Sequence, residues 1–313
     1  MTKVLTIGEV LVEIVATTRG SGFREAQPLI GPFPSGAPAI FIDQVGKLGT
    51  PCAILSRVGD DDFGHVTLDR LHADGVDVSG IEIASGESTG SAFVRYREDG
   101  SRAFVFNITH AACGRLEASS AGDALIETCS HLHIMGTALS APGLARRTTE
   151  AVARVKARGG TLSFDPNLRP EILAAPGLRA ALDEVLTQTD LFLPSGDEIL
   201  LFTSADDEAG AVAELLDRGI PEIVIKRGAA GASHFDAKGR RDVLPIAVEE
   251  VDPTGAGDSF GGAFVSLWLE GASPQTALAY ANAAGARAVT CLGPMEGTST
   301  RSELDALMAQ AKG

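Results

Sequence analysis

The sequence predicts an α/β protein built on a doubly wound, mainly parallel sheet with helices on both faces. Short apolar runs alternate with amphipathic helical patterns along most of the chain, which is typical of repeated strand–helix units. The apolar runs are continuous rather than alternating, as expected for strands that are buried on both faces. Glycines such as Gly159 and Gly219 end the helical patterns.

Six apolar runs are predicted as strands of this sheet. They lie at residues 4–7, 52–55, 132–135, 161–164, 191–193 and 223–225. The helical patterns between them include residues 142–157, 178–186 and 209–216. Ligands of such a sheet bind at the carboxyl ends of its strands, so polar residues that follow a strand are candidates for a site.

Two stretches interrupt the alternation. Residues 10–16 have the pattern of a strand, and residues 19–34 are predicted as a loop rich in glycine and proline. Residues 88–107 predict two strands joined by a hairpin turn around Asp99. Neither stretch continues the strand–helix alternation of the main sheet.

Composition and charge limit the classes of function. A chain of 313 residues with 44% apolar residues suits one large α/β domain. No apolar run approaches the ~18 residues that predict a membrane span, and the N-terminus leads directly into a strand pattern, so we expect a cytoplasmic protein without a membrane partner. The formal charge of −15 argues against nucleic acid, whose phosphates require a basic surface.

The segment at residues 252–260, DPTGAGDSF, is the strongest functional signal. A strand-like run at residues 243–251 precedes it, and a helical pattern follows. The backbone N–H groups of Gly255, Ala256 and Gly257 can point into one space, and together with the positive helix end they predict an anion site. A carboxylate beside that site, Asp258, suits a base that takes a proton from an attacking hydroxyl. The alternative is that Asp258 only balances the helix dipole.

Two common phosphate-binding glycine motifs do not fit. A dinucleotide fingerprint needs glycine or alanine where Phe260 stands, and residues 272–295 contain no acidic residue to hold a ribose. The pair Gly46-Lys47 is not the end of a P-loop, because Phe41 occupies the position of the first glycine.

The segment instead resembles the second signature of the ribokinase-like (PfkB) carbohydrate kinases, DTxGAGD. The resemblance implies a ribokinase-like fold in one domain, residues 1–313, with a small β-sheet lid at about residues 10–35 and 88–110. In the family the exposed face of such a lid commonly forms a homodimer contact, so the resemblance also suggests a homodimer through the lid. It implies that Asp258 is the catalytic base and that the amides at residues 255–257 form the anion hole. It also implies ATP with Mg²⁺ as phosphoryl donor and a small-molecule sugar as acceptor.

Further segments resemble the same family on the acceptor side. DPNLR at residues 165–169 is similar to the DxNxR motif of the fructokinase and 2-keto-3-deoxygluconate kinase branch, which implies that Asn167 and Arg169 bind the substrate. Gly36 and Ala37 fall in the first family signature, and Glu13 stands where many relatives hold sugar hydroxyls with aspartate. The resemblance implies that these residues bind the sugar as well.

The nucleotide side has its own matches. VIKRGAAG at residues 224–231 resembles the family's VxKxGxxG, which implies that Lys226, Gly228 and Gly231 contact the nucleotide. The alternative is an ordinary strand and turn with an exposed lysine. Asn282 lies in a small-residue helix similar to the one that flanks adenine in the family, and Thr254 is also expected beside the nucleotide.

Two acidic residues are candidates for cation binding. PSGDE at residues 194–198 resembles the family's NxxE with Ser195 in place of asparagine, and it implies that Glu198 orders Mg²⁺ through water. Asp252 is expected near a monovalent cation such as K⁺, as in many relatives.

The substrate expected from the resemblance is a ketose or a keto sugar acid, such as D-tagatose, D-fructose or 2-keto-3-deoxygluconate. One departure affects the pocket, because Ile40 stands where the family has an asparagine near the sugar. Two alternatives remain open: a nucleoside kinase of the same fold, and a non-catalytic sugar- or nucleotide-binding homologue.

Overall fold

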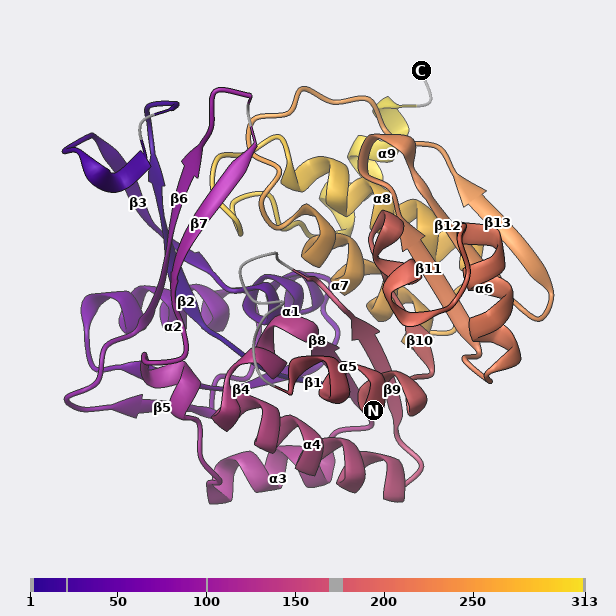
Figure 1. Ribbon diagram of the computed structural model, residues 1–313, viewed down its shortest axis with the longest axis horizontal. Coiled ribbons are helices and arrows are strands. Elements are labelled where there is room, and N and C mark those ends of the chain that lie inside the picture. Colours follow the sequence, from indigo (N-terminus) through magenta and orange to yellow (C-terminus); the bar gives the residue numbers. More distant parts are fainter. Residues whose placement is uncertain (1–2, 21, 100, 169–176, 312–313) are drawn as a thin grey trace.

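The computed structural model describes residues 3–20, 22–99, 101–168 and 177–311, which fold around two sheets (Figure 1). The larger sheet has nine strands, in the spatial order β13 (Gly239–Val243), β12 (Ala232–Asp236), β11 (Glu222–Lys226), β10 (Leu191–Phe192), β9 (Thr161–Asp165), β8 (His131–Met135), β1 (Val4–Ile7), β4 (Cys52–Gly59) and β5 (Ile81–Ala84). Neighbours from β11 to β5 are parallel, and only β12 and β13 add antiparallel pairs at one edge. The predicted mainly parallel sheet is confirmed.

Each of the six predicted apolar runs contributes to a strand of this sheet. The prediction of a further strand at residues 243–251 is wrong beyond Val243. β13 ends at Val243, and residues 244–250 pair with none of the strands that the structure describes. Pro245 has no N–H to donate to a ladder, and the Leu244 side chain is 83% exposed. Apolar residues in this segment therefore do not mark a buried strand.

Helices cover both faces of the large sheet. They are α1 (Ala37–Lys47), α2 (Asp62–Ala73), α3 (Ser120–Thr128), α4 (Pro142–Ala157), α5 (Leu178–Thr187), α6 (Glu208–Asp217), α7 (Ala256–Leu269), α8 (Pro274–Ala288) and α9 (Arg301–Gln310). One apolar cluster packs under α3 to α6, and a second packs under α1, α7, α8 and α9. β1 sends Leu5 and Ile7 into the first cluster and Val4 into the second, as expected for a strand buried on both faces.

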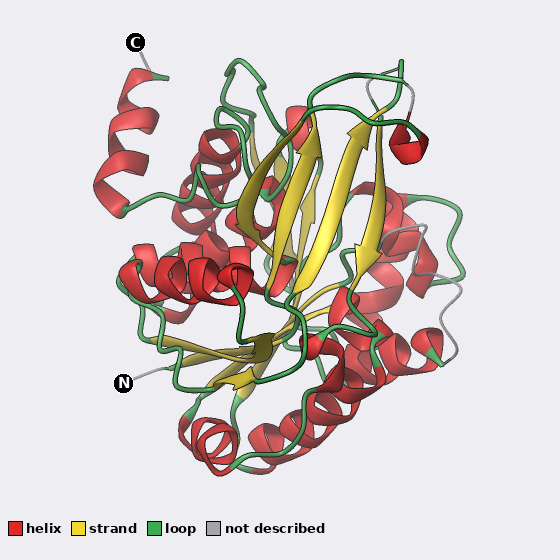
Figure 2. Cartoon of the chain, turned by 90° about the vertical axis from the view of Figure 1, so that its left-hand side faces the viewer, coloured by secondary structure: helices red, strands yellow, loops and turns green. Residues whose placement is uncertain are grey.

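The smaller sheet has the order β3 (Leu29–Ser35), β2 (Leu11–Ala16), β6 (Gly90–Tyr96) and β7 (Arg102–Asn107), and Figure 2 shows it standing apart from the larger one. The predicted hairpin is confirmed, because β6 and β7 pair antiparallel with Tyr96 opposite Arg102. The prediction of a loop at residues 19–34 is wrong for its second half, because residues from Leu29 onward form β3. Pro32 and Pro34 are tolerated there because β3 is an edge strand.

None of the helices in the described ranges combines the length and the apolar character that crossing a bilayer requires. The described part of the chain also contains five short 3₁₀ helices: η1 (Gly22–Arg24), η2 (Ala112–Arg115), η3 (Gly136–Ser140), η4 (Gly196–Phe202) and η5 (Gly228–Ala230).

Candidate active site

The N-terminus of α7 is the centre of the site. Gly255 caps the helix with φ of +80°, and a Cβ atom there would lie 2.3 Å from the carbonyl oxygen of Pro294, so only glycine fits without distortion. No side chain in the described ranges caps the helix, so the N–H groups of its first turn can face an anion. Asp258 lies in that first turn with 6% of its surface exposed, as the sequence predicted.

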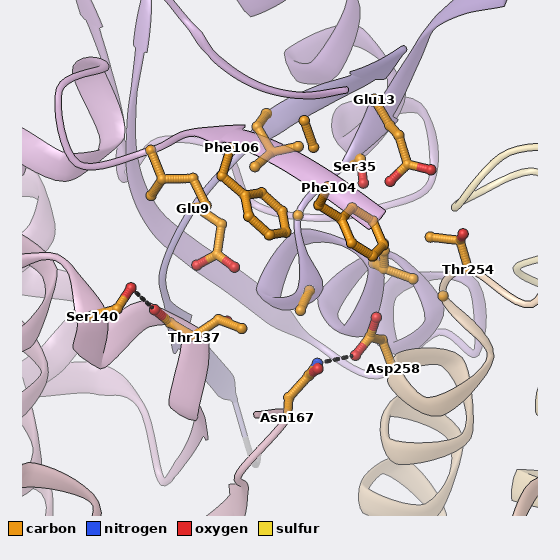
Figure 3. A pocket seen from close by; sticks show the side chains of 17 residues that line it. Glu9, Glu13, Ser35, Phe104, Phe106, Thr137, Ser140, Asn167, Thr254 and Asp258 are labelled. Atoms are coloured by element: carbon orange, nitrogen blue, oxygen red, sulfur yellow. Dashed lines mark hydrogen bonds between the residues drawn. The ribbon is translucent and has the colours of Figure 1, made fainter. Parts of the chain in front are cut away.

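Two cavities lie on either side of this helix end. Thr254, Gly255 and Asp258 border the first cavity, which has a volume of about 600 Å³ including its open mouth (Figure 3). Ala256 and Gly257 border the second, of about 1,220 Å³. One short segment of chain therefore contributes to both cavities, and ligands bound in them would meet at the start of α7.

The first cavity has one apolar wall, which the small sheet provides. Phe104 and Phe106 of β7 face it with their rings nearly parallel and 5.1 Å between centroids. Ile40 of α1 also borders this cavity, so the departure from the family asparagine makes its lining more apolar.

The polar groups of the first cavity come from the ends of strands and helices. Glu13 is an exception, because it projects from within β2. Of the predicted substrate-binding residues, the structure brings together Glu13, Gly36, Ala37, Asn167 and Asp258. Asn167 follows β9 and donates a hydrogen bond from Nδ2 to Asp258 Oδ1 across 2.8 Å.

Arg169, Gly36 and Thr254 were all predicted as site residues, but the structure treats them differently. Arg169 lies outside the described residues. Gly36 caps α1 with φ of +110°, where a Cβ atom would lie 2.3 Å from the carbonyl oxygen of Glu9. Thr254, expected beside the nucleotide, borders the first cavity rather than the second, and its hydroxyl accepts a hydrogen bond from Arg102 Nη1 of β7 across 2.7 Å.

Glu9 is a cavity residue that the sequence analysis missed. Its side chain is 3% exposed and borders the first cavity. Burial above all, together with the charge of Asp258, raises the pKa of Glu9 to about 7. The sequence contained a signal for Glu9, because this polar residue follows the β1 strand almost directly, at the sheet edge where ligands bind. The same holds for Thr137, which lies just after β8, borders the cavity and was not predicted either.

The second cavity contains the residues predicted to bind the nucleotide. Lys226, Gly228, Gly231 and Asn282 all border it, and Asn282 Nδ2 donates to the carbonyl oxygen of Leu244 across 2.9 Å. Most of the remaining lining is apolar, from Ile246, Ala247, Val248, Phe260, Ala286 and Val289. Such walls suit a flat aromatic ring such as a nucleobase.

Lys226 is not the exposed lysine that the alternative interpretation required. It is 7% exposed, and its ammonium group forms an ion pair with the Asp165 carboxylate at the end of β9. A Cβ atom on Gly257 would lie 3.6 Å from Lys226 Nζ, so the ammonium group is beside the first turn of α7. The lysine therefore brings positive charge to the point where the two cavities meet.

The two acidic residues expected near cations are held by backbone donors. Glu198 accepts the N–H groups of Leu168 and Ser195 across 2.8 and 2.7 Å, and burial together with the Asp165 charge raises its pKa. Asp252 is fully buried and accepts the N–H and hydroxyl of Thr254 across 2.9 and 2.7 Å. Within the described ranges, no group of three or more His, Cys, Asp or Glu side chains is placed to hold a metal ion.

Comparison with known proteins agrees with this architecture. Residues 1–301 match the family described as pfkB family carbohydrate kinase. The chain is 31% identical to "Probable fructokinase-5" of Arabidopsis thaliana, over 97% of each protein. It is also 31% identical to the 2-dehydro-3-deoxygluconokinase of Thermoproteus tenax, over 98% of this chain and 94% of that protein.

Solved structures superpose closely on the chain. A candidate ribokinase II from E. coli, in complex with ATP and Mg²⁺, has a TM-score of 0.93 and 48% identity over 99% of this chain and 100% of its own. A double mutant of the fructokinase from Vibrio cholerae O395, with fructose, ADP and a potassium ion bound, has a TM-score of 0.83 and 27% identity over 98% of both chains. The predicted ribokinase-like fold is confirmed, and the chain belongs to the pfkB family of carbohydrate kinases, phosphotransferases that act on a sugar hydroxyl.

Proposed function

We propose that the protein transfers the γ-phosphoryl group of Mg-ATP to a primary hydroxyl of a ketose or a keto sugar acid. The observation that carries this proposal is the position of Asp258, whose carboxylate borders one cavity while the neighbouring Gly257 borders the other. A sugar in the first cavity and a nucleotide in the second would place an attacking hydroxyl and a γ-phosphate at the same helix end. The similarity to fructokinases and to a 2-dehydro-3-deoxygluconokinase supports this class of acceptor.

The acceptor site combines hydrogen-bonding groups with an apolar wall. Glu13, Asn167 and the backbone at Gly36 and Ala37 hold hydroxyl groups of the sugar, and Arg169 keeps the substrate-binding role that its motif implies. The small sheet closes the cavity above them and limits the access of water, which would otherwise compete as acceptor. Its role is that of a lid.

The nucleotide site combines apolar walls with a few polar groups. The base lies against the apolar lining near Asn282, and the backbone at Gly228 and Gly231 allows close approach of the ribose and phosphates. The Lys226 ammonium group contacts the phosphates as a point charge.

The chemical step needs one base and one anion site. Asp258 accepts the proton of the sugar hydroxyl as the oxygen forms a bond to the γ-phosphorus, while the bond from that phosphorus to the β,γ-bridging oxygen breaks and ADP leaves. The amides of Gly255, Ala256 and Gly257 stabilise the negative charge on the transferring group. The hydrogen bond from Asn167 orients the carboxylate before the reaction.

The chain offers oxygen ligands for two cations. Each Glu198 oxygen accepts one N–H and keeps a lone pair, which fits an outer-shell contact to Mg²⁺ through water. Such a role agrees with the lack of a dedicated metal cluster among the described side chains, because Mg²⁺ in kinases is held mostly by phosphates and water. Bound Mg²⁺ would neutralise charge on the phosphates. The buried Asp252 carboxylate fits a nearby K⁺ ion.

The test is ADP release with Mg-ATP across ketoses, aldoses, keto sugar acids and nucleosides, with Asp258→Asn measured in parallel. Activity on a ketose or keto sugar acid that the variant loses would support the proposal. Activity on nucleosides alone would move the assignment to a nucleoside kinase. Saturable sugar binding without turnover would indicate a non-catalytic homologue.

A further inference from the structure

Glu9 has a buried carboxylate oxygen that no group among the described residues satisfies. Glu9 is 3% exposed, and within the described ranges its Oε2 atom has no hydrogen-bond partner. Glu9 lines the first cavity together with Phe104 and Phe106 of the small sheet (Figure 3). Gly36 packs against the backbone carbonyl oxygen of Glu9 with no room for a Cβ atom, so the backbone at Glu9 is closely packed.

A buried polar atom without a partner costs free energy, and the cost is far larger if the group is ionised. The arrangement is therefore explained either by a ligand that completes the hydrogen bonds or by a neutral carboxyl group. The cavity supports both explanations, because it is open to a ligand and already contains other carboxylates.

The groups around Glu9 favour its neutral form. Asp258 of α7 and Glu13 of β2 border the same cavity, and the charge of Asp258 acts on Glu9 directly. The Cys113 thiol of η2 also lies within electrostatic range, and burial raises its pKa to about 12, so it is neutral. The nearby Thr137 hydroxyl and the Ala37 N–H favour the ionised form, but burial outweighs them and raises the pKa of Glu9 to about 7. Among the lining residues that the structure describes, none is Lys, Arg or His.

We propose that Glu9 is an acceptor-binding residue that acts as a neutral carboxylic acid, whose hydroxyl donates a hydrogen bond to an uncharged oxygen of the sugar. This inference rests on the proposed function, since it assigns the first cavity to the acceptor. The partner is a hydroxyl or carbonyl oxygen, because both accept a hydrogen bond without adding negative charge beside Asp258 and Glu13. Ionisation of Glu9 removes the donor and weakens acceptor binding.

The test compares the wild-type protein with Glu9→Gln and Glu9→Ala, from pH 5.5 to 9, by measuring KM for the acceptor and for ATP. Glutamine keeps an N–H donor and cannot ionise, whereas alanine removes the donor. The wild-type acceptor KM should rise as pH increases above about 7, by about tenfold per pH unit if only the neutral form binds. Glu9→Gln should keep an acceptor KM near the low-pH value at every pH. Glu9→Ala should raise the acceptor KM about tenfold or more throughout, with KM for ATP unchanged.

A matched control is Glu117→Gln, the same substitution at an exposed glutamate away from both cavities. It should reproduce the wild-type pH profile. A pH-independent wild-type acceptor KM, or equal losses in Glu9→Gln and Glu9→Ala, would overturn the role as a neutral donor. Parallel increases in KM for sugar and for ATP in Glu9→Ala would assign Glu9 a structural role instead.

Calorimetric titration with the same sugars separates failure of this inference from failure of the proposed function. Sugar binding that weakens above about pH 7, in a protein that phosphorylates none of the sugars, would support the Glu9 inference and overturn the kinase reaction. Phosphorylation with an acceptor KM that neither pH nor the Glu9 variants change would overturn the inference and support the reaction.

Discussion

The side-chain amide of Asn167 donates a hydrogen bond to the carboxylate of Asp258, with 2.8 Å between Nδ2 and Oδ1. Asn167 has a φ of +41°, a left-handed conformation that asparagine tolerates better than most residues. Its N–H donates to Asp165 Oδ1 across 3.1 Å, which stabilises this conformation. The hydrogen bond between Asn167 and Asp258 joins the end of β9 to the start of α7 and orients the carboxylate of the proposed base.

Replacing Asn167 by glycine should keep the backbone and remove this hydrogen bond. We expect kcat for sugar phosphorylation to fall about tenfold to a hundredfold, because a hydrogen bond to a charged group contributes about 1.5 to 3 kcal/mol. Steady-state kinetics measure the change. Asn167→Ala removes the same bond and also strains the backbone, so it should unfold at a lower temperature than Asn167→Gly. Equal kcat in wild type and Asn167→Gly would remove Asn167 from the mechanism.

Replacing Asp258 by asparagine should preserve the fold and the binding of both substrates, because the side chain keeps its size. Turnover should fall by about 10² to 10⁴, which is the usual contribution of a general base. Single-turnover kinetics with labelled ATP measure the chemical step directly. Near-normal turnover would show that another group accepts the proton.

Replacing Gly255 by alanine should distort the start of α7. The added Cβ atom would meet the Pro294 carbonyl oxygen at 2.3 Å, in addition to the cost of a φ of +80°. Gly86 provides a control with a φ of +79° and open space around its Cβ position. We expect thermal unfolding to show a loss of about 1 kcal/mol for Gly86→Ala and a clearly larger loss for Gly255→Ala, which should also lose phosphoryl transfer. Equal losses would show that the contact with Pro294 has no effect.

Lys226 forms an ion pair with Asp165 and is proposed to contact the ATP phosphates. Replacing it by methionine, alone and together with Asp165→Asn, separates its effect on stability from its effect on ATP binding. The change leaves the fully buried Asp165 carboxylate without its cation, so stability should fall by about 3 to 5 kcal/mol. Adding Asp165→Asn removes that uncompensated charge and should recover much of the stability. KM for ATP should remain raised in both variants, because neither restores positive charge beside Gly257. Recovery of KM for ATP in the double variant would show that Lys226 acts only on the fold.

Asp43 should make stability depend on pH. Burial raises the pKa of this α1 carboxyl to about 7, although the Thr298 hydroxyl and the Arg70 guanidinium partly oppose the shift. Its folded-state pKa lies above the unfolded value, so its contribution to stability is complete below the unfolded pKa and is lost as pH rises through about 7. Asp43→Asn cannot ionise, and its free energy of unfolding relative to wild type should therefore rise between pH 4 and 8. A difference that stays constant over this range in urea titrations would contradict the assignment.

Much of the fold follows from local pattern. Continuous apolar runs separated by amphipathic helices specify a buried parallel sheet, because each run must be covered on both faces. The pattern fails where an apolar residue is not buried, as at Leu244, and where an edge strand accepts prolines, as in β3. Edge position and burial depend on neighbours from distant parts of the chain, so no local window contains them.

The sequence by itself determined the helix end at Gly255, the acidic residue in its first turn and the order of the strands along the chain, because turn conformation and hydrophobic period are local properties. Tertiary structure alone decided that Lys226 pairs with Asp165, that Thr254 borders the first cavity, and that Glu9 lies buried in the same cavity as Asp258. These outcomes depend on which strand ends become neighbours in the sheet. The charge state of Glu9 is therefore set by packing, since burial and nearby charge act only once the chain has folded.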